Sequence, residues 1–331
     1  MAKKKKAAPA AAASEFPSGD VLAELKTVLK ERNAKKRSQA AWRQILRAAP
    51  NNDFPVVMDF ALENGLIHAL DDAAKQLENG QRALSIIWTN PIDGSEMVWV
   101  PPGPFCVGAN KNRAECAGFS LARYPVTNAQ FEQFLEATSY QPVADHPDSE
   151  LFLHHWTKER KPPKAKETHP VVFVSYVDAL HYCHWAGMQL PTEWQWEKAA
   201  RGPEGRPFPW GTDTPGYGNK LANVRSKGTC AVGQYSRVRT PYGCEDMIGN
   251  VSEWCHMTDG DAPGFVPAPL SAGGPSMTEL GGHTAVRGSC FLRFDPKLMK
   301  SEHRRRLAKI RRNYWTGFRP AFLQSWCPAE P

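Results

Sequence analysis

The sequence predicts an α+β protein in which a small all-helical unit precedes a larger domain with few regular elements. Apolar residues recur at helical spacing over residues 18–88. The pattern then changes at a turn-rich stretch, and only short strand-like pieces and two helices follow, between long loops rich in glycine and proline. A length of 331 residues with 41% hydrophobic residues suits one large domain and one smaller unit.

We divide the chain into a tail (1–17), a helical unit (18–88), a linker (89–95) and a larger domain (96–325). The tail carries four consecutive lysines and then an alanine stretch that is interrupted by Pro9 and barely hydrophobic. This composition is typical of a disordered basic tail and not of a secretory signal. Since no run of 18 apolar residues exists, we expect no contact with a membrane and a cytoplasmic protein.

Four amphipathic helices are predicted in the helical unit. The first carries an apolar stripe that runs from Val21 to Leu29, and others begin near Ser38, Asp53 and Leu66. These stripes need a shared core or a neighbouring surface to cover them. We expect this unit to dock to another protein.

The larger domain is expected to hold short strands at 97–100, 105–107 and 171–174. One helix should begin at Thr127. A second should begin near Ser175, where Asp178 takes the place of the usual glutamate in a capping box. Long loops remain, and a domain of this kind needs a bound metal or dense aromatic packing to fix them.

The net charge of +7 is unevenly placed. Residues 1–48 hold twelve Lys/Arg against four Asp/Glu, a balance of +8, so the other 283 residues sum to −1. The charge of the whole chain therefore does not by itself indicate nucleic-acid binding.

The eight cysteines form no disulfide framework in a chain of this length, and no pair has the C-x-x-C spacing of a structural zinc site. We expect reduced, mostly buried thiols.

Several motifs in the larger domain stand in a particular order. They include Met97–Gly103, Tyr124–Asn128, Leu190–Gly202, Gly249–Trp254, Val286–Ser289 and Gly317–Arg319. In this order they resemble the formylglycine-generating enzyme (sulfatase-modifying factor) family, whose domain has a C-type-lectin-like fold. The resemblance covers residues 96–323, and the helical unit lies outside it.

The resemblance supplies a test of catalysis. The oxidases of this family hold copper(I) with two cysteines, five positions apart, downstream of an Arg-Gly-Gly-Ser motif. Alignment at Ser289 places Leu292 and Lys297 at those two positions. Cys290 lies two positions early and offers one thiol, although Cys255 or Cys327 could approach it in the folded chain.

We therefore assign no catalytic residue, with Ser289 and Cys290 as the weak candidates, and expect neither copper nor iron. The related iron-dependent sulfoxide synthases take their iron ligands from an N-terminal domain with closely spaced histidines. His68 is the only histidine in residues 1–96.

The resemblance also implies a structural calcium ion. In the family this ion is held by an Asn or Asp side chain, two backbone carbonyls and a glutamate. The corresponding groups here are the side chains of Asp246 and Glu253 and the carbonyls of Gly249 and Val251. Calcium is a hard cation that prefers oxygen ligands of this kind.

A basic segment lies near the C-terminus. Residues 287–319 hold eleven Lys/Arg and two acids, interleaved with aromatic residues. We predict a partner-binding surface made of Arg293, Phe294, Lys297, Lys300, Arg304, Arg311, Arg312 and Trp315. An acidic protein or peptide is favoured over nucleic acid as the partner, because no nucleic-acid-binding module is recognisable.

The resulting hypothesis is a non-catalytic binding protein that presents the loop from Phe291 to Trp315 to a macromolecular partner. One alternative is a metal-dependent oxidase with a non-standard centre near Ser289 and Cys290. Another is a ligand-binding protein diversified by a retroelement. The segment from Phe291 to Trp315 contains only one Asn, one Ser and one Tyr, and this composition argues against diversification.

Overall fold

The computed structural model describes residues 21–30, 32, 87–90, 92–101, 103–142, 148–214, 221–257, 281–293 and 295–323. The chain divides into two compact units, Met1–Ile67 with Cys327–Pro331, and His68–Trp326. In the first unit the described helix is α1 (Val21–Val28), which confirms the first predicted helix. The other three predicted helices lie outside the described residues. None of the described helices is long and apolar enough to cross a membrane.

The first and last described strands of the second unit lie in the same sheet. Strands β1 (Ile87–Thr89), β2 (Glu96–Val100), β5 (Phe119–Ala122) and β10 (Ala321–Leu323) pair in the order β1-β2-β5-β10, and every pair is antiparallel. Most of the described side chains on these strands are buried because both faces of the sheet are covered.

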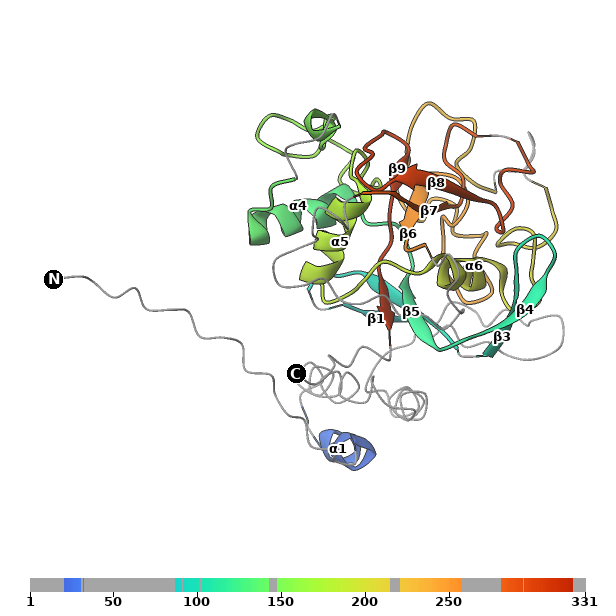
Figure 1. Ribbon diagram of the computed structural model, residues 1–331. Coiled ribbons are helices and arrows are strands. Elements are labelled where there is room, and N and C mark those ends of the chain that lie inside the picture. Colours follow the sequence, from blue (N-terminus) through green and yellow to red (C-terminus); the bar gives the residue numbers. More distant parts are fainter. Residues whose placement is uncertain are drawn as a thin grey trace. The chain divides into compact units, whose positions relative to one another are not determined.

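A second sheet supports the candidate site. Its strands are β6 (Ser252–Cys255), β7 (His283–Arg287), β8 (Arg304–Ala308) and β9 (Thr316–Gly317), in the order β8-β7-β6-β9. Strands β6, β7 and β8 pair antiparallel, whereas β6 and β9 pair in parallel. Figure 1 shows this sheet crossing the domain above α6 (Glu193–Arg201).

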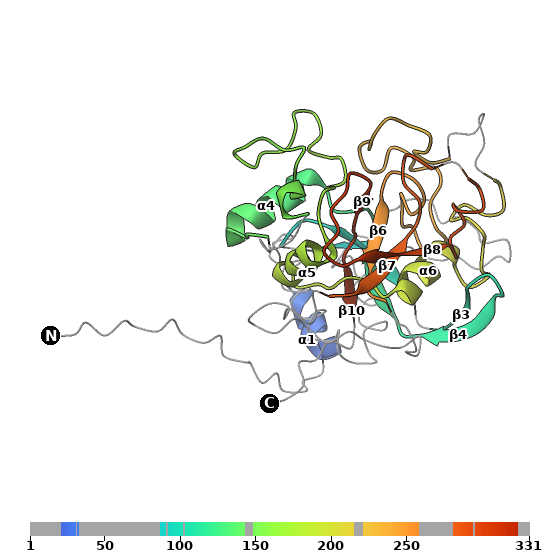
Figure 2. The same ribbon diagram turned by 45° about the horizontal axis from the view of Figure 1, so that its top comes forward.

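Helix α6 joins the second sheet to a two-stranded ribbon of β3 (Gly103–Val107) and β4 (Asn112–Cys116) (Figure 2). Its buried residues include Trp196 and four charged residues. Lys198 donates from Nζ to the carbonyl oxygens of Pro101, Gly103 and Cys116, which ties the helix to the ribbon. These bonds satisfy a buried ammonium group that would otherwise destabilise the core.

A buried ion-pair network holds α6 to β7. Glu197 accepts from Arg201 Nη1 at 2.6 Å and also pairs with Arg287. Arg287 also donates to the carbonyl oxygen of Glu302, just before β8. The network therefore fixes the strand that leads into the candidate site.

Helices α4 (Asn128–Thr138) and α5 (Tyr176–Trp185) pack against each other on one side of the domain. Both predicted starts are confirmed: Thr127 and Ser175 are N-caps, each in a complete capping box. An aromatic cluster fills their interface, where Phe131 stacks on Tyr182 with 5.8 Å between ring centroids.

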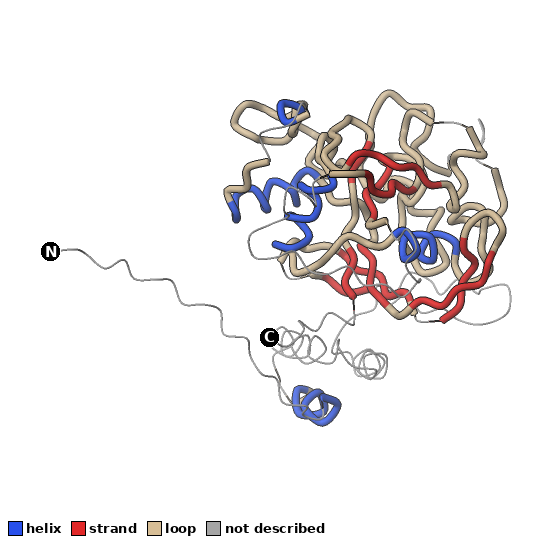
Figure 3. Tube along the Cα trace, in the orientation of Figure 1, coloured by secondary structure: helices blue, strands red, loops and turns tan. Residues whose placement is uncertain are grey.

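Two sequence-based expectations need correction. Residues 171–174, predicted as a strand, form no regular strand; the Val171 N–H donates to the Val126 carbonyl beside an isolated bridge between Thr127 and Pro170. Helix α6 was not predicted, although Thr192 and Gln195 form a complete capping box at its start. Figure 3 shows that loops make up much of the described domain, as predicted.

Candidate ligand-binding pocket

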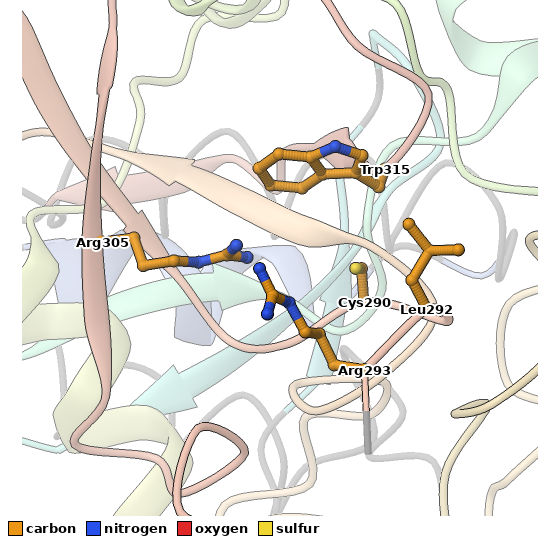
Figure 4. Close-up of a pocket in the computed structure, with 5 residues that line it drawn as sticks. All are labelled: Cys290, Leu292, Arg293, Arg305 and Trp315. Carbon is orange, nitrogen blue, oxygen red and sulfur yellow. The ribbon is translucent and has the colours of Figure 1, made fainter. Parts of the chain in front are cut away.

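A pocket of about 310 Å³ opens beside the second sheet, lined by Cys290, Leu292, Arg293, Arg305 and Trp315. Figure 4 shows the guanidinium groups of Arg293 and Arg305 pointing toward one another, near the Trp315 ring and the Cys290 sulfur. Such a pocket has room for one small group or for one side chain of a larger partner.

Backbone pairing positions the lining residues. Val286 pairs with Arg305 in the β7–β8 register, so Arg305 lies beside the strand that leads into the turn at 290–293. In that turn the Phe291 N–H donates to the Asn250 carbonyl at 3.0 Å. The Trp315 carbonyl accepts from the Ser252 N–H at 2.9 Å. The pocket is thus built from three segments that are each tied to β6 or to the loop before it.

The charged side chains that line the pocket are both positive. No described acidic side chain pairs with Arg293 or Arg305. Arg305 lies over the Trp315 ring, with 4.7 Å from Cζ to the centroid, and donates to Ser252 Oγ at 3.0 Å. Burial, and then the positive charge of Arg293, lower the pKa of Arg305, although its contacts with Cys290 oppose this.

The same positive field reaches His303, whose pKa is lowered by burial and then by Arg305, Arg287 and Arg293. Two converging guanidinium groups with no described acid between them can bind an anion, because an Arg fork binds a carboxylate or phosphate through two parallel hydrogen bonds.

Cys290 is buried and is the one thiol among the described lining residues of the pocket. Cys255 lies in β6, fully buried, with its Sγ 3.7 Å from the Glu253 carbonyl. Cys327 lies outside the described residues. Ser289, the other weak candidate, is buried, and its Oγ accepts from the Gly249 N–H. Within the described ranges, no three His, Cys, Asp or Glu side chains gather to hold a metal ion.

All seven described cysteines are free, as expected for reduced thiols. Two of them, Cys106 and Cys230, are partly exposed, and the other five are buried.

The structure brings only two of the eight predicted partner residues, Arg293 and Trp315, to the pocket. Phe294 lies outside the described residues. Lys297 is exposed on a turn. Three further predicted cations are also exposed but lie near acids: Lys300 is 3.8 Å from Glu302, Arg304 2.8 Å from Glu193 and Arg311 3.4 Å from Asp148.

Arg312 needs correction as a partner residue, because it lies in the core. Its side chain is 3% exposed and donates from Nε and Nη2 to the two carboxylate oxygens of Asp178. Tyr140 donates to the same carboxylate. Since its charge is already neutralised, we remove Arg312 from the proposed surface.

Sequence reasoning did not name Arg305 as a site residue. The signal was the period of two along β8, where Arg304 and Arg306 are exposed and Arg305 faces the other way. Leu292 was considered only as a replacement for a cysteine, yet it lines the pocket.

The predicted calcium ligands do not all fit the ion in this arrangement. Glu253 is fully buried and accepts from Arg319 through both oxygens, at 2.7 Å each, while Trp196 Nε1 donates to the same carboxylate at 2.6 Å. A carboxylate engaged in this way already has its counter-charge.

Asp246 is the group in this set that suits a cation. Its Oδ2 accepts from the Gly233 N–H at 2.8 Å, and none of the described Lys or Arg side chains forms an ion pair with it. Burial raises the pKa of Asp246 to about 6, in spite of the Gly233 bond and the charge of Arg319. The carbonyl-bearing residues Gly249 and Val251 follow it in the same buried loop.

Comparison with known proteins identifies the family to which the domain belongs. A family model for the sulfatase-modifying factor enzyme 1-like domain matches residues 86–322. The chain is 31% identical over 220 residues to the formylglycine-generating enzyme of Mycobacterium tuberculosis, covering 48% of this chain and 73% of that protein. It is 30% identical over 266 residues to the hercynine oxygenase of Mycolicibacterium smegmatis, covering 68% of this chain and 60% of that protein.

Among solved structures, PvdO from Pseudomonas aeruginosa aligns with a TM-score of 0.55 and 23% identity, covering 72% of this chain and 97% of that chain. This likeness bears on the fold alone and confirms the predicted α+β class with a C-type-lectin-like arrangement. The chain spans less than two thirds of the length of the hercynine oxygenase. With the family model matching most of its length, the chain belongs to the family of proteins that carry a sulfatase-modifying factor enzyme 1-like domain.

Proposed function

We propose that this protein is a binding protein that uses its formylglycine-generating-enzyme-like scaffold to hold an acidic group of a macromolecular partner. The observation that carries the proposal is the convergence of Arg293 and Arg305 in one pocket with no described acid between them. Arg305 is partly buried and Arg293 is exposed, and the two like charges repel each other, so an incoming carboxylate relieves that repulsion.

An acidic protein or peptide suits the pocket better than nucleic acid. Beyond residue 48 the chain is nearly neutral, with 29 basic and 30 acidic residues, so its net charge gives no support to binding along a phosphate backbone. Three of the exposed cations of the C-terminal basic segment also have acidic neighbours. A local pair of arginines is a feature that recognises one or two carboxylates.

The test is a binding titration with poly-glutamate and with a single-stranded oligonucleotide of similar charge. Arg293→Ala and Arg305→Ala should each weaken poly-glutamate binding at least tenfold, since each removes one charge-assisted contact of about 1.5–3 kcal/mol. Arg113→Ala is the matched control, because Arg113 is an exposed arginine on β4. Equal binding by all variants, or tighter binding to the oligonucleotide that the pocket variants lose, would contradict the proposal.

A second candidate function is a metal-dependent oxidase with a centre at Cys290. The observation that favours it is the position of Cys290 in the pocket of a domain whose relatives include the formylglycine-generating enzyme and the hercynine oxygenase. Metal analysis and oxygen uptake with a thiol reductant distinguish the two functions. Stoichiometric copper or iron that Cys290→Ala loses, together with oxygen uptake, would favour the oxidase over the binding protein.

We keep a calcium ion near Asp246 as a further proposal, with Asp246 as its carboxylate ligand and Gly249 and Val251 as the carbonyl donors. Support comes from the buried, unpaired carboxylate of Asp246. Calcium should raise the melting temperature of the protein, and Asp246→Asn should abolish that increase. A calcium response that the variant keeps would place the ion elsewhere.

A further inference from the structure

Exposed apolar side chains lie beside the pocket. In the described part of the chain, the large hydrophobic side chains with the greatest exposure are Ile92 (48%), Leu292 (46%) and Tyr314 (50%). Leu292 directly precedes Arg293, and Tyr314 directly precedes Trp315. Single exposed apolar residues are ordinary, but two of them next to the same pocket indicate an interaction site.

Tyr314 continues into a row of rings that we call the aromatic strip, made of Tyr314, Phe173 and His155. Ring centroids lie 6.3 Å apart between Tyr314 and Phe173, and 5.4 Å apart between Phe173 and His155. Phe291, which lies between two lining residues of the pocket, is 6.2 Å from Tyr314. The aromatic strip therefore begins at the pocket and extends over the loop that follows α4.

The backbone at Phe173 is strained in a way that holds this ring in place. Phe173 has a φ of +60°, a left-handed conformation that bulky residues rarely adopt. Its N–H donates to the Asn313 carbonyl at 2.8 Å, and its carbonyl accepts from the Leu153 N–H at 3.1 Å. Strain of this kind persists where the surroundings enforce it, and it is concentrated at binding sites.

We propose that the aromatic strip takes an apolar side chain of the same partner segment whose carboxylate enters the pocket. The inference rests on the proposed function and names the chemistry of the partner: a peptide segment in which an acidic residue lies near an aliphatic or aromatic one. The pocket contributes positive charge. Tyr314 contributes exposed apolar surface, and the half-buried rings of Phe173 and His155 lie behind it.

The experiment is a selection of random heptapeptides displayed on phage against the full chain, followed by titration of the selected peptides. We expect enriched peptides to hold Asp or Glu within three positions of Leu, Phe or Trp. Tyr314→Ser should weaken the selected peptides about three- to tenfold, because one aromatic contact of about 0.5–1.5 kcal/mol is lost. Ile92→Ser is the matched control and should bind like the original chain, because Ile92 is equally exposed and is not part of the strip.

The outcomes separate this inference from the proposed function. If the selected peptides are acidic but show no preference for apolar residues, and Tyr314→Ser binds them as tightly as the original chain does, the inference about the aromatic strip is wrong. The proposed binding of a carboxylate by the two arginines is then still supported. Selected peptides without acidic residues would overturn both. Preferred binding of a single-stranded oligonucleotide that Tyr314→Ser loses would also overturn both, because the rings would then stack on bases. Melting temperatures of both variants near that of the original chain establish that any loss is local.

Discussion

The ion pair between Glu253 and Arg319 predicts that Glu253 stabilises the fold through this pair and not through a calcium ion. Both side chains are fully buried, and the guanidinium donates to both carboxylate oxygens at 2.7 Å. Arg319 also donates to the carbonyl oxygens of Ala122, Arg123 and Glu245, so one guanidinium joins β5, β6 and the loop before β6. The replacement Glu253→Gln removes the negative charge and leaves this buried cation uncompensated.

The expected loss of stability follows from the burial of both side chains. Breaking a buried ion pair from one side costs about 3–5 kcal/mol, because the remaining charge keeps its desolvation penalty. For a domain of 150–250 residues, each kcal/mol lowers the melting temperature by about 2–4 °C, so we expect a loss of about 6–20 °C. Glu136→Gln is the matched control, because Glu136 pairs with Lys161 at the surface, with 62% of its side chain exposed. It should change the melting temperature little.

Differential scanning calorimetry with and without the chelator EGTA is the assay. If the ion pair is the role of Glu253, the variant loses stability in EGTA and in calcium alike. The double variant Glu253→Gln/Arg319→Met should lose less stability than the sum of the single variants, because no lone charge is left. If EGTA lowers the melting temperature of the original chain as far as the variant, and the variant shows no further loss, Glu253 acts through calcium and the reasoning is refuted.

Three further predictions concern stability, each read from melting temperatures. Burial lowers the pKa of His155 to about 4. Stability is therefore lost as pH falls from the unfolded value near 6.5 toward 4, by up to about 3 kcal/mol, and His155→Phe should remove this acid-dependent loss between pH 7.5 and 4.5. Gly249→Ala should destabilise by about 1–3 kcal/mol, because φ is +85° and a Cβ would lie 2.7 Å from the Asn223 carbonyl oxygen, whereas Gly228→Ala meets nothing. Thr192→Ala should cost about 1 kcal/mol by removing the N-cap of α6.

Each of these has a result that would count against it. If the His155 variant loses as much stability between pH 7.5 and 4.5 as the original chain, other groups cause that loss. Equal melting temperatures for the two glycine variants would show that the loop at Gly249 yields without cost. A Thr192 variant as stable as the original chain would show that tertiary contacts alone fix the start of α6.

Local signals predicted the helices better than the strands. Ser175 was identified because an N-cap and its partner Asp178 lie three residues apart, which a sequence displays directly. Thr192 carries the same signal, but the segment Leu190–Gly202 was interpreted as a family motif and not as the start of a helix. Residues 171–174 have the β-branched composition of a strand, but whether an extended segment finds a ladder partner depends on distant residues.

Charged residues were harder to place because their partners are remote in the sequence. Arg312 lies 134 positions from Asp178, and Arg319 lies 66 positions from Glu253. A list of cations near the C-terminus therefore could not separate those neutralised in the core from those facing solvent. The separation matters here because Arg312 is paired with Asp178 in the core, whereas Arg293 and Arg305 line the pocket.

The contrast between these arginines explains how one scaffold can be stable and still hold an unsatisfied charge. Arg287, Arg312 and Arg319 are buried with carboxylates and tie the strands and helices together. Arg305 lies on a strand that this framework fixes, so its position is set before any ligand arrives, and the framework offsets the repulsion from Arg293. A side chain that is preorganised in this way loses little conformational freedom on binding, and for that reason Arg305 should contribute more than the exposed Arg293 to the discrimination between acidic and neutral groups.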